Sequence, residues 1–283
     1  MVLKKSGKKR AIIVTVLLIL SVTIISLIML FVYRSNSLKQ ITKAIENDDT
    51  ILLRELCQKP FADVDGKRPL SDFLITVLDG ITDEKPLKLA IRKGNPEMVK
   101  ILAESGADIN YRGPYKRSYY MDTAICWGKA DIVSILADKN AKSRGEYYCL
   151  VILAQSVQRE AIDIEDYKST YEVLLNSGRI KTDEGEQLWD GLCSYCCLAV
   201  FQYYLTSGTV DVDYRFSDGA SFLHRCASAK DDEDNLMEFA TMLLNNGIDT
   251  SIRDCDGNTA WDLAKRRGFT RLASLFNPKN NQE

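Results

Sequence analysis

The chain contains one histidine, His224, and this limits the chemistry that its side chains can perform. A catalytic triad or a zinc site that needs several imidazoles cannot be built from it. The sequence has no G-x-x-x-x-G-K-[ST], H-E-x-x-H or G-x-S-x-G motif. Carboxylate pairs such as Glu165-Asp166 lie in polar stretches and are interpreted as solvated surface. No catalytic residue and no cofactor are therefore predicted.

The eight cysteines are the second group that could do chemistry. Cys193, Cys196 and Cys197 lie close together and would suit a metal ion. Outside the cytoplasm the cysteines could form disulfides, but the sequence does not give the pairing, and adjacent cysteines bridge each other only with strain. Small, buried cysteine is the usual state of such residues. We therefore interpret them as structural and predict no metal site, with a cysteine-dependent metal-binding protein as an alternative.

Length and charge restrict the class of protein. The chain has 283 residues, of which 46% are hydrophobic, and a formal net charge of -2. Residues 1–33 hold five of the 37 Lys and Arg residues and no acid, so the remainder has 32 basic against 39 acidic residues. A mildly acidic remainder argues against nucleic acid as the partner.

Residues 11–33 predict a transmembrane helix, because they contain no charged residue. At about 1.5 Å per residue, a helix of this length spans a hydrocarbon core of roughly 30 Å. A cleaved signal peptide is the alternative, but its apolar region is usually about 7–15 residues and ends in a small-x-small site. This run is longer and ends in Phe31-Val32-Tyr33-Arg34.

The basic residues around this helix predict its orientation. Residues 1–10 form a basic tail with five Lys and Arg residues, while Arg34, Lys39 and Lys43 follow the apolar run. Lys and Arg are retained on the cytoplasmic side. We expect a single-pass membrane protein with a cytoplasmic N-terminus and the remaining chain in the periplasm or outside the cell.

Residues 86–110, PLKLAIRKGNPEMVKILAESGADIN, read as two short helices. Apolar residues recur at helical spacing on both sides of Gly94-Asn95-Pro96, and Gly106 suits a left-handed helix end. The stretch resembles an ankyrin repeat, roughly T-P-L-H-x-A-A-x-x-G-H-x-x-I-V-x-x-L-L-x-x-G-A-D-x-N. Lys85 and Lys88 replace the Thr and His of that pattern, which weakens its usual cap hydrogen bonds.

The resemblance implies an all-α ankyrin-repeat solenoid, with helix-turn-helix repeats and short β-hairpin fingers, after one N-terminal transmembrane helix. The gap from Gly94 to Gly128 is one repeat length, about 33 residues in this family. Acidic insertions are expected inside two repeats, at 160–166 and 231–234. The expected segments are N-terminal capping helices over 34–84, repeats over 85–276 (about 85–117, 118–146, 147–184, 185–217, 218–255 and 256–276) and a tail over 277–283.

The repeat register also suggests roles for His224 and for the cysteines. His224 lies in Ser221-Phe222-Leu223-His224, close to the T-P-L-H of the family, whose histidine ties neighbouring hairpins by hydrogen bonds. Cys193 stands where the pattern has a small buried Ala, and Cys196 and Cys197 fall at the turn between two helices. The resemblance thus implies structural roles for them.

A partner-binding surface is expected at the fingers, because interface hot spots are enriched in Tyr and Arg. The first finger precedes Tyr119 and Tyr120, which replace Thr-Pro and are interpreted as mainly structural. The second finger follows the fourth repeat. The predicted contact residues are Tyr111, Arg112, Tyr115, Lys116, Arg117, Tyr214, Arg215 and Phe216.

The fold that the resemblance implies offers an extended concave surface and no deep pocket. We therefore expect a non-catalytic module that binds a protein partner on this surface and a membrane through residues 11–33. By analogy with small exported repeat proteins, one version is an immunity protein of the cell envelope that neutralises an exported toxin. A cytoplasmic-facing ankyrin adaptor of a host cell or an intracellular bacterium is a further alternative.

Overall fold

The computed structural model describes residues 2–60, 62, 64–65, 85–112, 118–180 and 185–277, with side chains from Thr15 onward. The described residues form α-helices joined by turns, and none of them is in a β-strand. The chain divides into an N-terminal unit, Met1–Ile109, and a C-terminal unit, Asn110–Glu283. Residues 66–84, the last part of the expected capping helices, lie outside the described residues.

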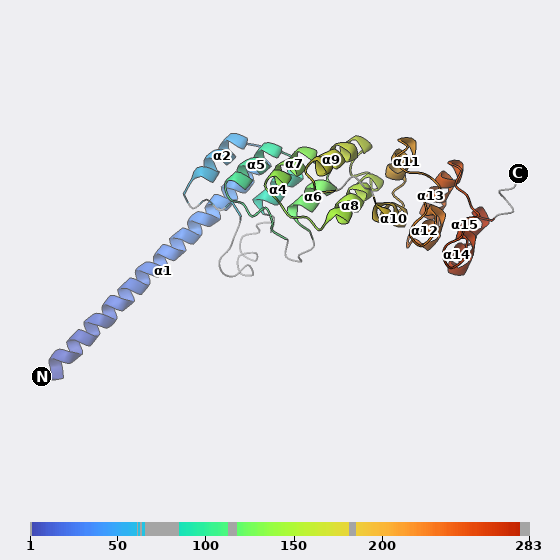
Figure 1. Cartoon of the computed structure of the whole chain (residues 1–283). Helices are drawn as coiled ribbons and strands as arrows, with labels where there is room; N and C mark the ends of the chain where they lie inside the picture. The colour runs from blue at the N-terminus through green and yellow to red at the C-terminus, as the bar shows by residue number, and fades with distance from the viewer. Residues whose placement is uncertain are drawn as a thin grey trace. The chain divides into compact units, whose positions relative to one another are not determined.

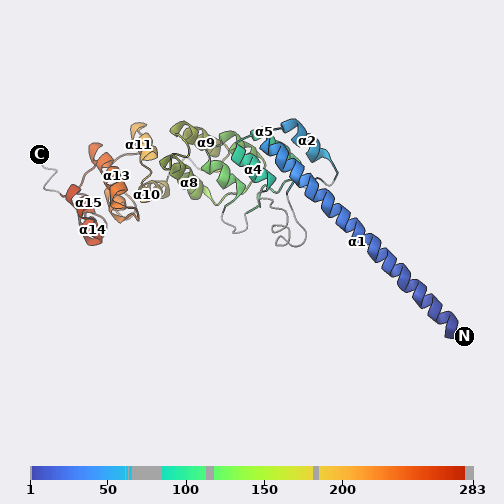
Figure 2. The ribbon, with the colours of Figure 1, turned by 180° about the vertical axis from the view of Figure 1, so that it is seen from behind.

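The N-terminal unit begins with α1, one unbroken helix over Val2–Glu46 (Figure 1, Figure 2). Its apolar side chains from Val16 to Tyr33 are solvent-exposed, whereas Leu38, Ile41 and Ile45 are buried against α2 (Thr50–Gln58) and α4 (Pro86–Lys93). The expected membrane span and first capping helix are thus a single element. No Gly or Pro lies between them to stop the helix.

The helix pair α4 and α5 (Pro96–Glu104) confirms the repeat predicted over 86–110. Gly94 ends α4 in the left-handed region at φ 75°, which glycine adopts without a steric penalty. The side chain of Asn95 then accepts a hydrogen bond from the Met98 N–H and caps α5. As expected from its sequence, Lys85 makes no side-chain cap at the start of α4.

The C-terminal unit consists of five described helix pairs, each a repeat. Their bounds are α6 (Tyr120–Cys126) with α7 (Ala130–Asp138), α8 (Glu146–Gln158) with α9 (Ile164–Asn176), α10 (Glu186–Ser194) with α11 (Leu198–Thr206), α12 (Phe222–Ser228) with α13 (Glu233–Asn245), and α14 (Ala260–Arg267) with α15 (Thr270–Leu275). Contacts join α6, α8, α10, α12 and α14 in order, and we call these helices the first-helix row. Their partners α7, α9, α11, α13 and α15 form the second-helix row (Figure 1).

Aromatic and aliphatic side chains fill the space between the two rows. Phe201 packs edge-on against Phe222 and Phe239, with ring centroids 4.8 and 5.0 Å away. Between α9 and α11, the hydroxyls of Tyr167 and Tyr204 are 2.7 Å apart in a buried hydrogen bond. The bond gives each buried hydroxyl a partner in place of the water that it would contact at the surface.

Two sequence expectations differ from the structure in detail. The acidic stretches run from the turn before each second helix into its first helical turn, and the side chains of Asp163 and Asp232 cap α9 and α13. Acidic residues favour this position because the N-terminus of a helix carries partial positive charge.

The fingers within the described residues are tight turns rather than β-hairpins. Phe216 N–H donates to Ala220 C=O at 3.0 Å across one of them, and this pairing is too short to form a strand ladder.

Candidate functional site

His224 is a structural residue, as the repeat register predicts. Its Nδ1 accepts hydrogen bonds from the backbone N–H of Ser221 at 3.1 Å and from its hydroxyl at 2.8 Å. This assigns the ring proton to Nε2, which donates to Asn258 C=O in the next finger at 3.0 Å. Burial lowers the pKa of His224, so the neutral ring is favoured. Both nitrogens are therefore occupied: Nδ1 caps the start of its own helix, and Nε2 joins two repeats.

Asp122 makes the equivalent connection between α6 and the next finger. Its carboxylate is fully buried and accepts hydrogen bonds from Tyr119 N–H at 2.8 Å and from Arg144 N–H at 3.1 Å. Burial raises the pKa of Asp122, although these bonds and the guanidinium groups of Arg144 and Arg112 oppose the rise. Sequence reasoning missed this role. The signal was available, because Asp122 occupies the same position in its repeat as His224.

The cysteine side chains are free thiols in buried or half-buried sites, except for the exposed Cys255. Burial raises the pKa of Cys149 to about 11 and those of Cys197 and Cys226 to about 12. Since the thiolate is the nucleophile and the metal ligand, these thiols are held in their unreactive form. Within the described part of the chain, no three His, Cys, Asp or Glu side chains lie where they could hold a metal ion.

The first predicted finger is described only at its base. Tyr111 is half-buried, with its ring centroid 6.0 Å from that of Tyr120. The guanidinium of Arg112 lies over the ring of Tyr119, 4.8 Å from its centroid. The predicted contact residues Tyr115, Lys116 and Arg117 lie outside the described residues.

The second predicted finger is more structural than its composition indicates. Phe216 is only 3% exposed, so its ring cannot offer much surface to a partner. The ring of Tyr214 stacks on that of Phe222 with centroids 5.8 Å apart, and is half-buried. Arg215 is exposed, but its Nη1 donates to Gly219 C=O at 3.2 Å within the same turn. Of the three, Arg215 is the residue most open to contact.

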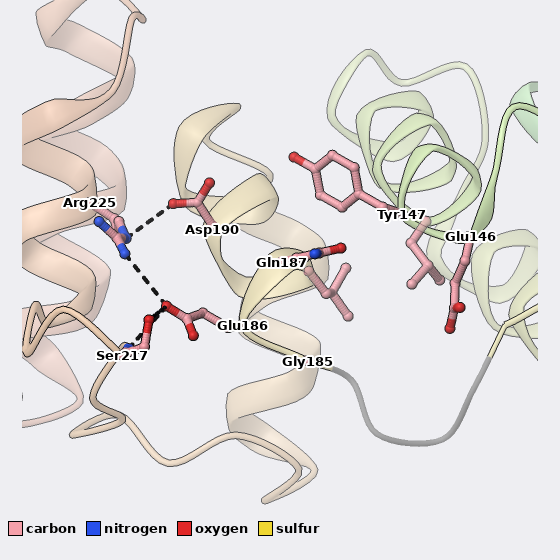
Figure 3. A pocket seen from close by; sticks show the side chains of 10 residues that line it. Glu146, Tyr147, Gly185, Glu186, Gln187, Asp190, Ser217 and Arg225 are labelled. Atoms are coloured by element: carbon pink, nitrogen blue, oxygen red, sulfur yellow. Dashed lines mark hydrogen bonds and ion pairs between the residues drawn. The ribbon is translucent and has the colours of Figure 1, made fainter.

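A solvent-open cleft lies on the first-helix row and was missed by sequence reasoning. It holds about 750 Å³ and is lined mainly by residues of α8, α10 and α12, and we call it the α8–α12 cleft. Tyr147, 40% exposed, extends from α8 towards α10, where Gln187 and Asp190 lie (Figure 3). Gly191 permits the close approach of these helices, because a Cβ there would lie 2.7 Å from the side chain of Val151.

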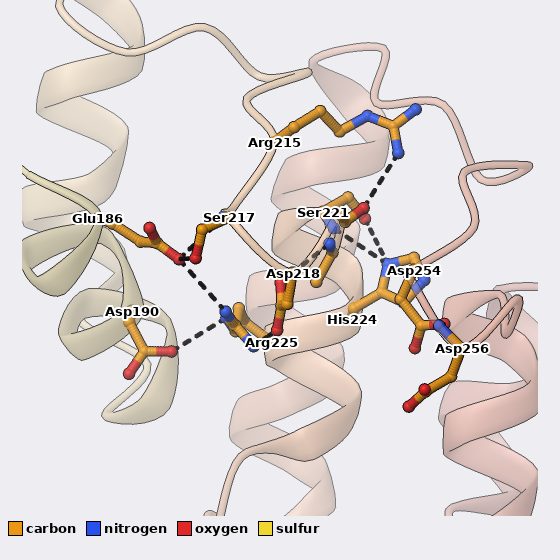
Figure 4. Close-up of polar contacts among 12 residues, drawn as sticks. Glu186, Asp190, Arg215, Ser217, Asp218, Ser221, His224, Arg225, Asp254 and Asp256 are labelled. Carbon is orange, nitrogen blue, oxygen red and sulfur yellow. Dashed lines mark hydrogen bonds and ion pairs between the residues drawn. The ribbon is translucent and has the colours of Figure 1, made fainter.

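Arg225 of α12 anchors one wall of the cleft. Its guanidinium pairs with Asp190 at 3.0 Å, with Asp218 at 2.8 Å and with Glu186 at 3.8 Å (Figure 4). It also covers the ring of buried Phe216 at 4.2 Å. Burial acts to raise the pKa of Asp218, but hydrogen bonds from Ala220 N–H and Arg225 outweigh it and the pKa is lowered. Three carboxylates around one guanidinium leave this wall acidic.

Comparisons with known proteins agree with this architecture. The family model of the ankyrin repeat matches residues 84–114. The ankyrin repeat domain of Bcl-3, described as a unique member of the IkappaB protein family, is similar in structure with a TM-score of 0.50 and 17% identity, over 83% of this chain and 96% of that one. At this identity the similarity shows the fold alone. A search of curated protein sequences finds no match.

Two further structures are similar at lower TM-scores. The ankyrin repeat domain of human ASB11 gives 0.47 with 19% identity, over 83% of this chain and 95% of that one. A structure of a predatory endopeptidase from Bdellovibrio bacteriovorus in complex with an immunity protein gives a TM-score of 0.42 with 19% identity. The similarity covers 70% of this chain and 100% of the matched chain. The family match and the Bcl-3 similarity establish the fold. The chain has an ankyrin-repeat fold, with the repeat family matched at residues 84–114, and its long apolar N-terminal helix is a candidate membrane anchor.

Proposed function

We propose that this protein binds a protein partner through the first-helix row and fingers of its C-terminal unit, while α1 anchors it in a membrane. The α8–α12 cleft is the main support for this function. It presents the exposed side chains of Tyr147 and Gln187 beside the carboxylates that surround Arg225. By contrast, His224 and the buried thiols are used inside the fold. The surface therefore suits recognition better than chemistry.

The anchoring part of the proposal rests on α1. Its portion from Thr15 onward contains a window that is long and apolar enough to cross a membrane. The buried residues from Leu38 onward belong to the same helix, so the span continues into the N-terminal unit without a linker. We infer that the N-terminus is cytoplasmic, because the five basic residues precede the span.

Alkaline extraction of membranes tests the anchor. The full chain should stay in the membrane pellet with its intact mass, whereas a chain beginning at Leu38 should be soluble. The truncation keeps the buried end of α1, so the N-terminal unit should still fold. A mature protein that has lost its first segment and is released into the soluble fraction would identify a cleaved signal peptide instead.

A reporter fusion tests the orientation. Alkaline phosphatase, which needs export, should be active when fused after residue 283. A cytoplasmic reporter at the same point should be inactive. The reverse result would place the repeats in the cytoplasm and favour the adaptor alternative.

Site-specific photo-crosslinking tests the binding surface. A photoreactive residue at exposed Gln187, in the α8–α12 cleft, should give a discrete adduct in intact cells. Thr241 is an exposed position of α13 on the second-helix row and is the matched control. An adduct from Thr241 with none from Gln187 would place the binding surface on the second-helix row and contradict the proposal.

A narrower version of the proposal makes the partner an exported toxin that the protein neutralises. This version predicts a toxic product from a neighbouring gene and survival only when the anchored repeat protein is present. A non-toxic product recovered in the Gln187 adduct would exclude this version and leave the binding function in place.

A further inference from the structure

A second depression on the first-helix row lies between α6 and α8, and we call it the α6–α8 groove. It holds about 560 Å³. Asp122, Thr123, Cys126 and Trp127 line it from α6 and the residue that follows, as their helical spacing requires. Arg112 and Arg144 border it at the end near the start of α6, whereas Trp127 lies at the opposite end of that helix. The groove therefore has a basic end and an apolar end.

The two guanidinium groups at the basic end lie on aromatic rings. Arg112 is 4.8 Å from the ring centroid of Tyr119, and Arg144 is 3.9 Å from that of Tyr148. Stacking of this kind holds a guanidinium in place while its N–H donors remain available at the edge of the plane. Both side chains are therefore prearranged to receive an anion.

Neither guanidinium forms an ion pair with a carboxylate within 110–112, 118–180 and 185–277. Asp122 is the nearby acid, but its two oxygens accept from the backbone N–H groups of Tyr119 and Arg144. The Nε of Arg112 is buried and has no hydrogen-bond partner among the described residues.

The apolar end of the groove has its own unused surface. Trp127 directly follows α6 and is 44% exposed, whereas the large apolar residues within α6 are buried. Ile152 of α8 also lines the groove. Tryptophan is the residue type most typical of binding hot spots, together with Tyr and Arg.

We propose that the α6–α8 groove binds an acidic peptide segment of the partner, with an Asp or Glu carboxylate held by Arg112 and Arg144 and a large apolar side chain packed on Trp127. The seven residues of α6 separate the two ends by about 10 Å, at about 1.5 Å per residue. In an extended peptide at about 3.3 Å per residue, this corresponds to about three positions. The apolar end favours a peptide over a phosphate headgroup, which would use the arginines alone. This inference rests on the proposed binding function.

A random peptide library displayed on phage provides the test, with the full chain in nanodiscs of zwitterionic lipid as bait. Selected peptides should be enriched in Asp or Glu with a large apolar residue about three positions away. The double variant Arg112→Gln/Arg144→Gln should bind the selected peptides about tenfold or more weakly. The control Lys139→Gln/Lys230→Gln removes the same charge at two exposed positions outside the fingers, after α7 and after α12, and should bind them as the wild type does.

Several outcomes would overturn the proposal. Basic or uncharged selected peptides would do so, as would an equal loss of binding in the control variant. If the double variant does not melt as the wild type does, Arg144→Gln alone is used, and Trp127→Ala should weaken binding independently. If no peptide is selected and anionic lipid vesicles bind in a way that depends on the two arginines, the groove binds phosphate headgroups instead. If the Gln187 adduct forms while the arginine variants change nothing, this inference fails and the binding function stands.

Discussion

At the residue scale, four non-glycine residues of the described part adopt the left-handed backbone region: Asp48, Asn140, Glu160 and Cys196. Glu160 and Cys196 occupy the turn between two helices, where Gly94 and Gly128 stand in other repeats. Asn and Asp tolerate this region better than other residues with a Cβ. The strain at Glu160 therefore has no evident use, since its side chain is exposed.

Glu160→Gly should stabilise the protein by about 0.5–1 kcal/mol. Relief of left-handed strain, worth about 1–2 kcal/mol, exceeds the extra backbone entropy that glycine loses on folding. Urea unfolding of the wild type and the variant measures the difference. Gly128→Ala is the opposite control, because a Cβ there meets Ile162 at 3.0 Å and φ is 57°. A destabilised Glu160→Gly variant would contradict the assigned conformation.

His224 should make stability depend on pH. Its pKa is lowered in the folded protein from an ordinary value of 6.5, so the unfolded chain binds the proton more tightly. The free energy of unfolding should therefore fall as pH drops below about 6.5, since an imidazolium cannot accept from Ser221 N–H. His224→Asn keeps an acceptor but does not titrate. Unfolding measured at about pH 7.5 and about pH 5.5 should show a larger loss for the wild type than for this variant. Equal losses would contradict the assigned tautomer.

At the element scale, repeats cap one another's helices. The short helix α15 has no side-chain cap of its own. Instead, Glu233 in the first turn of α13 accepts hydrogen bonds from Arg271 N–H at 2.8 Å and Leu272 N–H at 3.1 Å. Arg271 also pairs with Asp234. The acidic stretch at 231–234 therefore stabilises the last repeat, in addition to starting its own helix.

Glu233→Ala should loosen the last repeat, because it leaves two N–H groups of α15 without their charged acceptor. The expected cost is about 1–2 kcal/mol. Hydrogen exchange should become faster in α15 while α6 to α9 are unchanged. Glu238→Ala, at an exposed position of the same helix, is the control and should have little effect. Unchanged exchange in α15 would mean that these bonds do not stabilise it.

Sequence patterns predicted helices correctly, but they contain no signal for the depressions on the first-helix row. The helical spacing around Gly94 and the apolar run of residues 11–33 are local signals, and each matches an element of the structure. The caps Asp163 and Asp232 are also local, but they were interpreted as parts of insertions. The α8–α12 cleft depends on contacts between repeats, such as the approach of Gly191 to Val151, which no local pattern contains.

At the scale of the whole molecule, we assign a different role to each of the two units. The N-terminal unit joins a candidate membrane span to a repeat core within one helix. The C-terminal unit presents two surfaces of different charge on its first-helix row, the α6–α8 groove with Arg112 and Arg144 and the acidic α8–α12 cleft. A partner that fits both would carry acidic and basic segments, and this pairing would favour specificity over affinity.

Hydrogen exchange of the full chain in nanodiscs, with and without the partner that the Gln187 adduct identifies, tests the binding surface most directly. The account predicts that the partner slows exchange in α6, α8, α10 and α12 and in the fingers beside them. Exchange in α9, α11 and α13 should stay as in the free protein. Protection confined to the second-helix row, with the first-helix row unchanged, would contradict the central claim.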